Sequence, residues 1–348
     1  MIKTMVEDAV IYAVLKVDGL GLGLEQMAHT LLDAGIDHFC VTETDDVRRL
    51  LKTNLPIQEI LILRPLVEKT EIEQIVRDPR VTFTVGSYED AELLYRIALN
   101  NKVIVSAHVA IDTGLGRYGL PWNDLAGVLR LYKSHFSINY TGIFTHFATP
   151  ARNISVMRQY RRFQRIIQKM EAHGIKPGTR HCASSTALIF HPEMKMDAVR
   201  LGSALLGRAV GSERCGLQMV GYCEAQVDAV HSLSRGQTVG YGSTFRAYRN
   251  MQVAVVDIGT THGLRCGYAC GKHTGLSRLS EICRAIKRGF WREAMFSGEI
   301  SNHIAPVVGN AFSECAVLDV TDCECHAGDI VRFAINPMFI RNMKRDWI

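Results

Sequence analysis

The 348-residue sequence lacks any apolar run near the roughly 18 residues that a membrane-spanning helix needs. Its first residues, MIKTMVEDAV, carry acids and no apolar segment typical of an export signal, so we expect a cytoplasmic protein without a membrane partner. A formal net charge of only +5 gives little electrostatic support for nucleic-acid binding. The ten cysteines are accordingly expected to be reduced thiols rather than disulfides.

The first two-thirds of the chain instead alternates short apolar runs with amphipathic segments. Strands are predicted at residues 9–17, 38–42, 59–63, 81–85, 102–111, 138–147, 180–183 and 196–202. Helices are predicted at 24–34, 45–52, 70–77, 87–99, 122–133 and 155–171, the third with a capping box formed by Thr70 and Glu73. Strands alternating with helices over about 200 residues predict an α/β fold, a (β/α)8 barrel of the TIM type spanning residues 1–216.

After residue 216 the pattern changes to strand-like runs separated by turn signals. Strands are predicted at 225–233, 252–258, 314–320 and 329–335, which indicates a C-terminal mostly-β domain over residues 217–348. A helical insertion near residues 276–295 has apolar residues at helical spacing and a basic remainder, so we expect a surface helix.

Polar residues recur where the predicted barrel strands end. Lys16 closes the first apolar run, Arg117 follows the fifth strand, His146 ends the sixth, and Ser185 and Arg200 accompany the seventh and eighth. Each alone has a structural explanation, since a strand-end lysine can extend into water and a lone histidine is commonly a hydrogen-bonded core residue. Together, at the end of the barrel where the loops line the site, they predict an active site.

A lysine, several cations and a cradle of glycine and serine suit a phosphorylated aldehyde cofactor. The lysine can bond the aldehyde, backbone amides and hydroxyls can hold the phosphate, and cations can tune the ring. The combination indicates pyridoxal 5′-phosphate (PLP). A lysine-dependent aldolase without a separate cofactor is the alternative interpretation of Lys16.

Six sequence blocks resemble, in order and spacing, the bacterial alanine racemase family of fold-type III PLP enzymes. They are VLKVDGLGLG (14–23), IDTGLGRYGL (111–120), GIFTHFAT (142–149), HCASS (181–185), VRLGSALLG (199–207) and VGYGSTF (239–245). The resemblance covers nearly the whole chain. It implies a homodimeric PLP-dependent racemase that converts an amino acid to its mirror image, with alanine as the first substrate to consider and serine or a longer side chain as alternatives.

The resemblance also implies two bases on opposite faces of the substrate Cα, which a racemase requires. These are Lys16, which would also hold PLP covalently, and Tyr241, which would come from the β domain across a dimer interface. The other implied cofactor contacts are Arg200 at the pyridine nitrogen, Arg117 at the phenolic oxygen, His146 against the ring, and Ser185, Gly202 and Ser203 at the phosphate. Arg117 and the backbone around Ser313 would bind the substrate carboxylate.

Several positions depart from the family pattern on the cofactor side. Leu20 and Leu22 stand where the family has a phosphate-contacting tyrosine and a histidine, so phosphate binding is expected to be weaker or differently arranged. Ala110 replaces the lysine that supports the neighbouring arginine, here Arg117. The family also carries a strand and helix before the first barrel strand, where few residues stand here, so that cover is either missing or supplied by another segment or chain.

The substrate side departs as well. Thr260 replaces a second active-site tyrosine, and Phe312 and Glu314 flank Ser313 in place of other side chains. These changes leave open which amino acid is bound. They also keep open a catalytically degenerate homologue with a regulatory or partner-binding role. A fold-type III decarboxylase is less favoured, because its glycine-rich phosphate motif and its Cys-x-x-Asp motif are absent.

Two further features have competing interpretations. The basic residues of the helix at 155–171 could contact an acidic partner, but its opposite face is apolar, which favours a helix packed on a sheet with a solvated basic side. Cysteines and histidines of the second domain could ligate zinc: Cys266, Cys270, His273, Cys323, Cys325 and His326. Their spacing matches no standard zinc motif, so no metal is expected.

Overall fold

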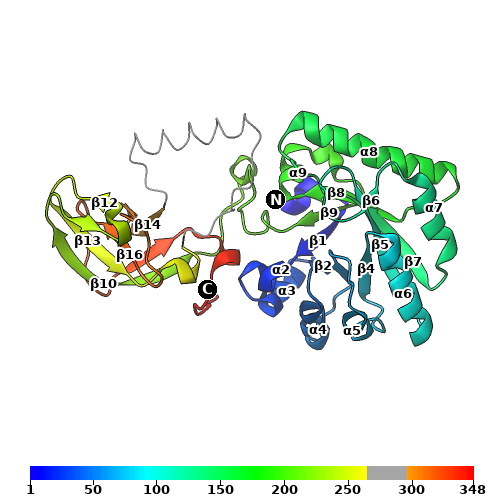
Figure 1. Ribbon diagram of the computed structural model, residues 1–348, viewed down its shortest axis with the longest axis horizontal. Helices are drawn as coiled ribbons and strands as arrows, with labels where there is room; N and C mark the ends of the chain where they lie inside the picture. The colour runs from blue at the N-terminus through cyan, green and yellow to red at the C-terminus, as the bar shows by residue number, and fades with distance from the viewer. Residues whose placement is uncertain (265–295) are drawn as a thin grey trace. The chain divides into compact units, whose positions relative to one another are not determined.

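The computed structural model describes residues 1–264 and 296–348, which form two compact units, Met1–Val220 and Gly221–Ile348 (Figure 1). The helix predicted near 276–295 lies outside the described residues, as do Cys266, Cys270 and His273. Among the helices of the described ranges, none combines the length and apolar character needed to cross a bilayer. The cysteines in these ranges are free thiols.

The first unit is built on eight parallel strands in the order β4-β3-β2-β1-β9-β8-β7-β5, closed by pairing of β4 with β5. These strands are β1 (Val10–Val14), β2 (His38–Val41), β3 (Glu59–Ile62), β4 (Val81–Val85), β5 (Val105–Asp112), β7 (Ile138–Phe144), β8 (Thr179–Ser184) and β9 (Ala198–Leu201). A short strand β6 (Leu120–Pro121) adds to β5. The predicted (β/α)8 barrel is therefore confirmed.

Helices surround the barrel, as Figure 1 shows. They are α1 (Ile2–Val6), α3 (Leu24–Asp33), α4 (Thr44–Lys52), α5 (Lys69–Glu73), α6 (Tyr88–Asn101), α7 (Leu125–Ser134), α8 (Asn153–Ala172) and α9 (Ser185–Phe190). The capping-box prediction was wrong, because Thr70 lies inside α5 and Glu68 is its N-cap residue. The packing prediction for α8 was right: Val156, Phe163 and Met170 are buried on one face, which the 3.6-residue period dictates.

The second unit is mostly β, as predicted. Its main sheet has the antiparallel order β15-β14-β17-β10-β13-β16, and a two-stranded sheet pairs β11 with β12. The strands are β10 (Cys223–Leu233), β11 (Thr238–Val239), β12 (Phe245–Arg246), β13 (Met251–Val256), β14 (Ser297–Ile300), β15 (His303–Pro306), β16 (Ala316–Asp319) and β17 (Ile330–Phe333). One sheet face buries a core that includes Leu318 and Phe333.

The β14–β15 hairpin was not predicted. Its two-residue connection, Ser301 and Asn302, has positive φ at both positions (47° and 63°), which matches the twist that tight hairpins need. Neither segment has the apolar alternation of a typical strand, because only Ile300 and Ala305 are fully buried among their side chains.

Candidate active site

Lys16 begins a left-handed turn directly after β1, the segment α2 (Lys16–Leu20). Val17, Asp18, Gly19 and Leu20 all have φ between 53° and 64°. Such a conformation costs an ordinary residue roughly 1–2 kcal/mol, and strain of this kind concentrates at functional sites. The predicted strand therefore ends earlier than residue 17, and the chain changes direction at Lys16.

Hydrogen bonds to Asp18 hold this turn in place. Its Oδ1 accepts from the Leu24 backbone N–H at 3.2 Å and from Nη2 of Arg49 at 2.8 Å. Arg49 also donates to Glu25 through Nε and Nη2, at 2.7 and 2.6 Å. The start of α3 and an arginine from α4 thus fix the backbone that carries Lys16.

The Lys16 side chain is half-buried, and within the described ranges it makes no hydrogen bond or ion pair. Burial lowers the pKa of its ammonium, and the nearby charge of Arg117 lowers it further. A lysine in this state is more readily deprotonated than one in water, which makes it a better base and nucleophile.

Arg117 is presented by a loop between β5 and β6. Asp112, at the end of β5, accepts through Oδ1 from the backbone N–H groups of Gly114 and Leu115 at 2.8 and 2.9 Å, and from Gly116 at 3.2 Å. Gly119 returns the chain with φ of 121°, and a Cβ there would lie 2.6 Å from the Asp112 nitrogen. These contacts fix the loop on both sides of Arg117.

Arg200, on β9, is 4% exposed and lies inside the barrel. Its Nη1 donates to Nδ1 of His181 at 2.7 Å and to the His181 carbonyl at 3.1 Å. Its Nη2 donates to the Thr145 carbonyl at 2.7 Å and lies 3.3 Å from Nδ1 of His146. Within the described ranges the Nε–H makes no hydrogen bond. One donor of this buried guanidinium is therefore available to a ligand.

His146 follows β7 and lies among cations. Burial lowers the pKa of its imidazole to about 3, and Arg200, Arg117 and Lys16 contribute in the same direction. The ring is therefore neutral at physiological pH. The four predicted residues Lys16, Arg117, His146 and Arg200 are brought together by four different strands, and a small cavity beside them is lined by Arg117, His146 and Ala110 among others.

Ser185 begins α9, and its Oγ accepts from the backbone N–H groups of Gly202 and Ala204, both at 3.1 Å. With its acceptor side occupied, the hydroxyl proton is free to be donated outward. The N–H of Ser203, between these two donors, makes no hydrogen bond within the described ranges. Leu20 packs beside Gly202, 3.8 Å from where a Cβ would stand. The Ser185 hydroxyl and the Ser203 N–H are therefore two available donors beside an apolar wall, whereas the Gly202 N–H is already donated to Ser185.

The second unit holds the other predicted site residues. Tyr241 is 82% exposed, in a 3-10 turn (Tyr241–Ser243), and its ring lies edge-on to Phe312 at 5.5 Å between centroids. The Ser313 carbonyl accepts from the N–H and the hydroxyl of Thr261, at 2.9 and 2.6 Å. The Phe312 carbonyl accepts from the Thr260 N–H at 2.9 Å. These residues form one loop cluster in the β domain.

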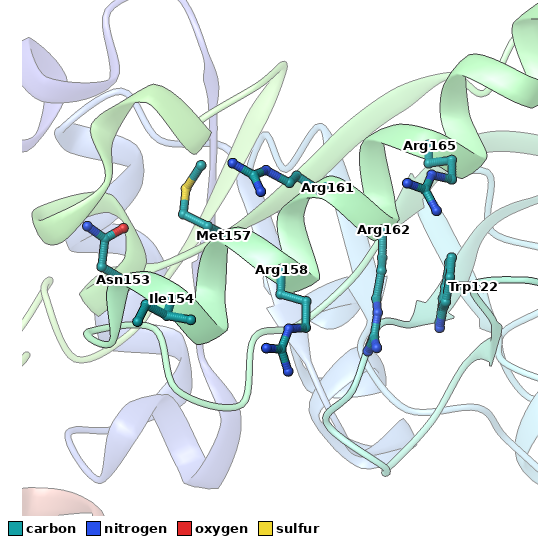
Figure 2. A pocket seen from close by; sticks show the side chains of 8 residues that line it. All are labelled: Trp122, Asn153, Ile154, Met157, Arg158, Arg161, Arg162 and Arg165. Carbon is teal, nitrogen blue, oxygen red and sulfur yellow. The ribbon is translucent and has the colours of Figure 1, made fainter.

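A larger concave surface lies on the outer side of α8, and Figure 2 shows the side chains that line it. Four arginines reach into it, of which Arg162 and Arg165 lie over the Trp122 ring at 4.9 and 5.9 Å. Arg162 also donates to the Thr113 carbonyl at 2.8 Å, in the loop before Arg117. This surface holds none of the predicted site residues. Across the described ranges, no group of three or more potential ligand side chains could hold a metal ion.

The residues that support the site were not predicted. Asp18, Asp112 and Thr145 act on the turn, the loop and Arg200 respectively, and His181 was recognised only as part of a motif. One signal was present: parallel barrel strands are buried on both faces and read as apolar runs, so a histidine inside VSAHVAID marks an interior polar contact.

Both units of the chain match known protein families. Residues 1–210 match the family model described as "Alanine racemase, N-terminal domain", and residues 220–337 match "Alanine racemase, C-terminal domain". The chain is 29% identical to the alanine racemase of Desulfovibrio desulfuricans over 92% of this chain and 81% of the relative. It is 30% identical to alanine racemase 1 of Oceanobacillus iheyensis over 91% and 79%.

A solved structure with the same fold is alanine racemase from D-cycloserine-producing Streptomyces lavendulae, with a TM-score of 0.79, 20% identity, and 95% of this chain and 82% of that chain covered. Both family models match in the order in which the two units occur, and together they account for most of the sequence. The chain therefore belongs to the alanine racemase family.

Proposed function

We propose that this chain is a PLP-dependent amino-acid racemase, with alanine as its first candidate substrate, in which Lys16 and Tyr241 move the Cα proton. The observation that carries the proposal is the cluster of Lys16, Arg117, His146 and Arg200 at one end of the barrel, beside the two available donors of Ser185 and Ser203. The alanine racemase relatives support the choice of substrate class.

The donor set fits PLP on the observations above. The half-buried Lys16 amine suits a covalent bond to the aldehyde, and the Ser185 hydroxyl with the Ser203 N–H suits the phosphate, while the Gly202 N–H orients Ser185. The Nε–H of Arg200 suits a neutral ring nitrogen, because a guanidinium keeps its own proton. His146 and Arg117 would lie against the ring and its phenolic oxygen. When bound, PLP supplies the electron sink that makes the Cα proton of an amino acid acidic.

Within that site, Lys16 and Tyr241 each transfer the proton on one face of the substrate Cα. Lys16, whose pKa is lowered by burial and by Arg117, accepts or returns the proton on one face of Cα. Tyr241 serves the other face from a second copy of the chain, and its exposure in its own unit leaves it accessible for that role. Arg117 and the backbone at Ser313 bind the substrate carboxylate. Because Tyr241 would come from a second copy, we propose a homodimer. We also propose a cytoplasmic location.

The experiment that tests the proposal is chiral analysis of L-amino acids incubated with protein and PLP, with the absorption spectrum recorded before and after borohydride. We expect D-alanine to form and PLP to become fixed to Lys16. Lys16→Ala should lose both, because it removes the covalent anchor and one base, whereas Lys52→Ala, an exposed lysine on α4, should lose neither.

The outcomes separate the competing functions. Covalent PLP without D-enantiomer would favour a degenerate homologue, which Leu20 and Thr260 make the second candidate. Release of carbon dioxide would identify a decarboxylase. Racemisation retained in Lys16→Ala would overturn the assignment of Lys16.

A further inference from the structure

Five polar side chains from five different strands form a line through the barrel interior. Arg200 Nη1 lies 2.7 Å from Nδ1 of His181, whose Nε2 lies 2.9 Å from Nδ1 of His108. His108 Nε2 lies 3.8 Å from Oε1 of Glu59, and Oε2 of Glu59 accepts from the Tyr12 hydroxyl at 2.8 Å. The line thus runs from the candidate active site to the first residue of β3.

Packing holds the two imidazoles in this line. His108 is 1% exposed and His181 is fully buried. The Tyr12 ring stacks on His181 at 5.4 Å between centroids and meets the edge of His108 at 6.1 Å. Gly142 on β7 leaves space for the His108 ring, since a Cβ there would lie 2.5 Å from Nε2.

The polar contacts of this line have a single consistent direction; three of them are hydrogen bonds, and the contact of His108 with Glu59, at 3.8 Å, is longer than one. A guanidinium only donates, so Nδ1 of His181 must accept and its Nε2 must carry the proton. That Nε2–H then donates to Nδ1 of His108, which leaves the proton of His108 on Nε2, facing Glu59. A carboxylate only accepts, so the group at the far end suits the same direction.

Glu59 is the carboxylate that this line connects to the buried charge of Arg200. Within the described ranges, Arg200 forms no ion pair with a carboxylate, although it is a buried cation. The carboxylate of Glu59 is joined to it through two neutral rings, and its Oε1 is buried without a hydrogen-bond partner. At 3.8 Å from Nε2 of His108, this oxygen is close enough for an electrostatic contact with the ring but beyond hydrogen-bond distance.

We propose that Glu59 is a positioning residue for Arg200: from the end of the line opposite the guanidinium, its charge helps to keep His108 and His181 in the Nε2–H tautomer, so that the guanidinium stays fixed with its Nε–H free for the cofactor ring. The cofactor part of this inference rests on the proposed function. The tautomer part concerns the chain alone and is measurable without PLP.

The first test is ring ¹⁵N NMR of histidine-labelled protein without PLP. We expect His108 and His181 each to show a single Nε2–H tautomer. In Glu59→Gln, which keeps the shape but removes the charge, His108 should show averaged shifts of both tautomers, and Glu59→Asp should restore the single form. The control Asp37→Asn should change neither ring, because Asp37 pairs with His38 at 2.7 Å at the same end of the barrel but outside the line.

The second test is the dissociation constant of PLP, which a purely structural role would leave unchanged in a folded variant. We expect Glu59→Gln to raise it about twofold to thirtyfold, the range of typical long-range coupling, and Asp37→Asn to leave it unchanged. An Nδ1–H tautomer in the unaltered protein would overturn the proposal even if Glu59→Gln failed to fold. Unchanged tautomers or unchanged PLP affinity in Glu59→Gln would overturn it too, whether or not the protein racemises amino acids.

Discussion

The barrel and the β domain present their candidate catalytic groups in opposite ways. In the barrel, Arg200 is buried and His146 and Lys16 are partly buried, and the burial itself lowers their pKa values. In the β domain, Tyr241 stands 82% exposed in a short turn and contacts one aromatic ring. The chemistry of the barrel groups is therefore tied to folding, whereas that of Tyr241 is not.

This difference predicts which substitutions separate activity from stability. A change in the barrel site should alter both, because the same hydrogen bonds hold the loops and tune the charges. A change at Tyr241 should alter catalysis alone.

Tyr241→Phe should lower the rate of racemisation by roughly 10²- to 10⁴-fold, the usual contribution of a general acid or base, while the free energy of unfolding stays within about 0.5 kcal/mol. The measurement is uptake of solvent deuterium at Cα from each enantiomer, together with urea unfolding. Tyr248→Phe, at another exposed tyrosine of the same domain, serves as the control and should affect neither. Equal rates for Tyr241→Phe and the unaltered protein would remove Tyr241 from the mechanism.

Asp112→Ala, in the barrel, should lower stability and impair activity together, unlike Tyr241→Phe. It removes an acceptor of three backbone N–H groups in the loop that carries Arg117, so we expect a loss of about 2–3 kcal/mol in unfolding free energy. The same change should raise KM for the amino acid, because Arg117 loses its fixed position. Asp45→Ala, which breaks an exposed ion pair with Arg48, should cost under about 1 kcal/mol. If Asp112→Ala raises KM but leaves the free energy of unfolding unchanged, the loop positions Arg117 without contributing to stability, which contradicts the prediction.

The outline of both units could be predicted from the sequence because local patterns decide it. Apolar runs bounded by turn residues marked the barrel strands, and polar residues at their ends marked Lys16, Arg117, His146 and Arg200. The motif match added Tyr241, whose surroundings no local pattern would have distinguished from those of any exposed turn tyrosine.

The remaining features depend on contacts between distant segments. Val17 has φ of 57°, which no propensity scale would assign to a β-branched residue; the turn is held by Asp18 and Arg49 from another helix. Likewise, Glu59 and His108 become neighbours only after β3 and β5 take their places in the closed barrel. A one-residue register shift would point either side chain to the opposite face.

Acid should destabilise the barrel through its buried histidines. Burial lowers the pKa of His108 to about 4 and moves the pKa of His181 well below its usual value. The unfolded chain binds these protons near pH 6.5 and the folded chain does not, so stability is complete above that pH and falls as the pH drops toward 4. For His108 alone, the loss is about 2 kcal/mol by pH 5.

Urea unfolding at pH 7.5 and pH 5 checks this expectation. His108→Gln should show a smaller difference between the two pH values than the unaltered protein. His29→Gln, at an exposed histidine of α3, should leave the difference as it is. A stability that stays constant from pH 7.5 to pH 5 would mean that the two rings take up protons as readily in the folded barrel as in the unfolded chain.

A substitution in the left-handed turn at Lys16 should have the smallest effect, and it also tests whether stability and activity are linked in the barrel. Val17→Gly removes the steric cost of φ at 57° in a β-branched residue, and Val17 is 37% exposed, so little packing is lost. The greater freedom of glycine in the unfolded chain opposes this gain. Because the left-handed strain is roughly 1–2 kcal/mol, we expect a net stabilisation of about 0.5–1 kcal/mol in urea unfolding. Val67→Gly, at an exposed valine without positive φ, should instead destabilise. If the stabilised Val17→Gly variant also racemises more slowly, the strain in this turn serves to position Lys16; if its rate is unchanged, Asp18 and Arg49 alone are sufficient to hold the lysine in place.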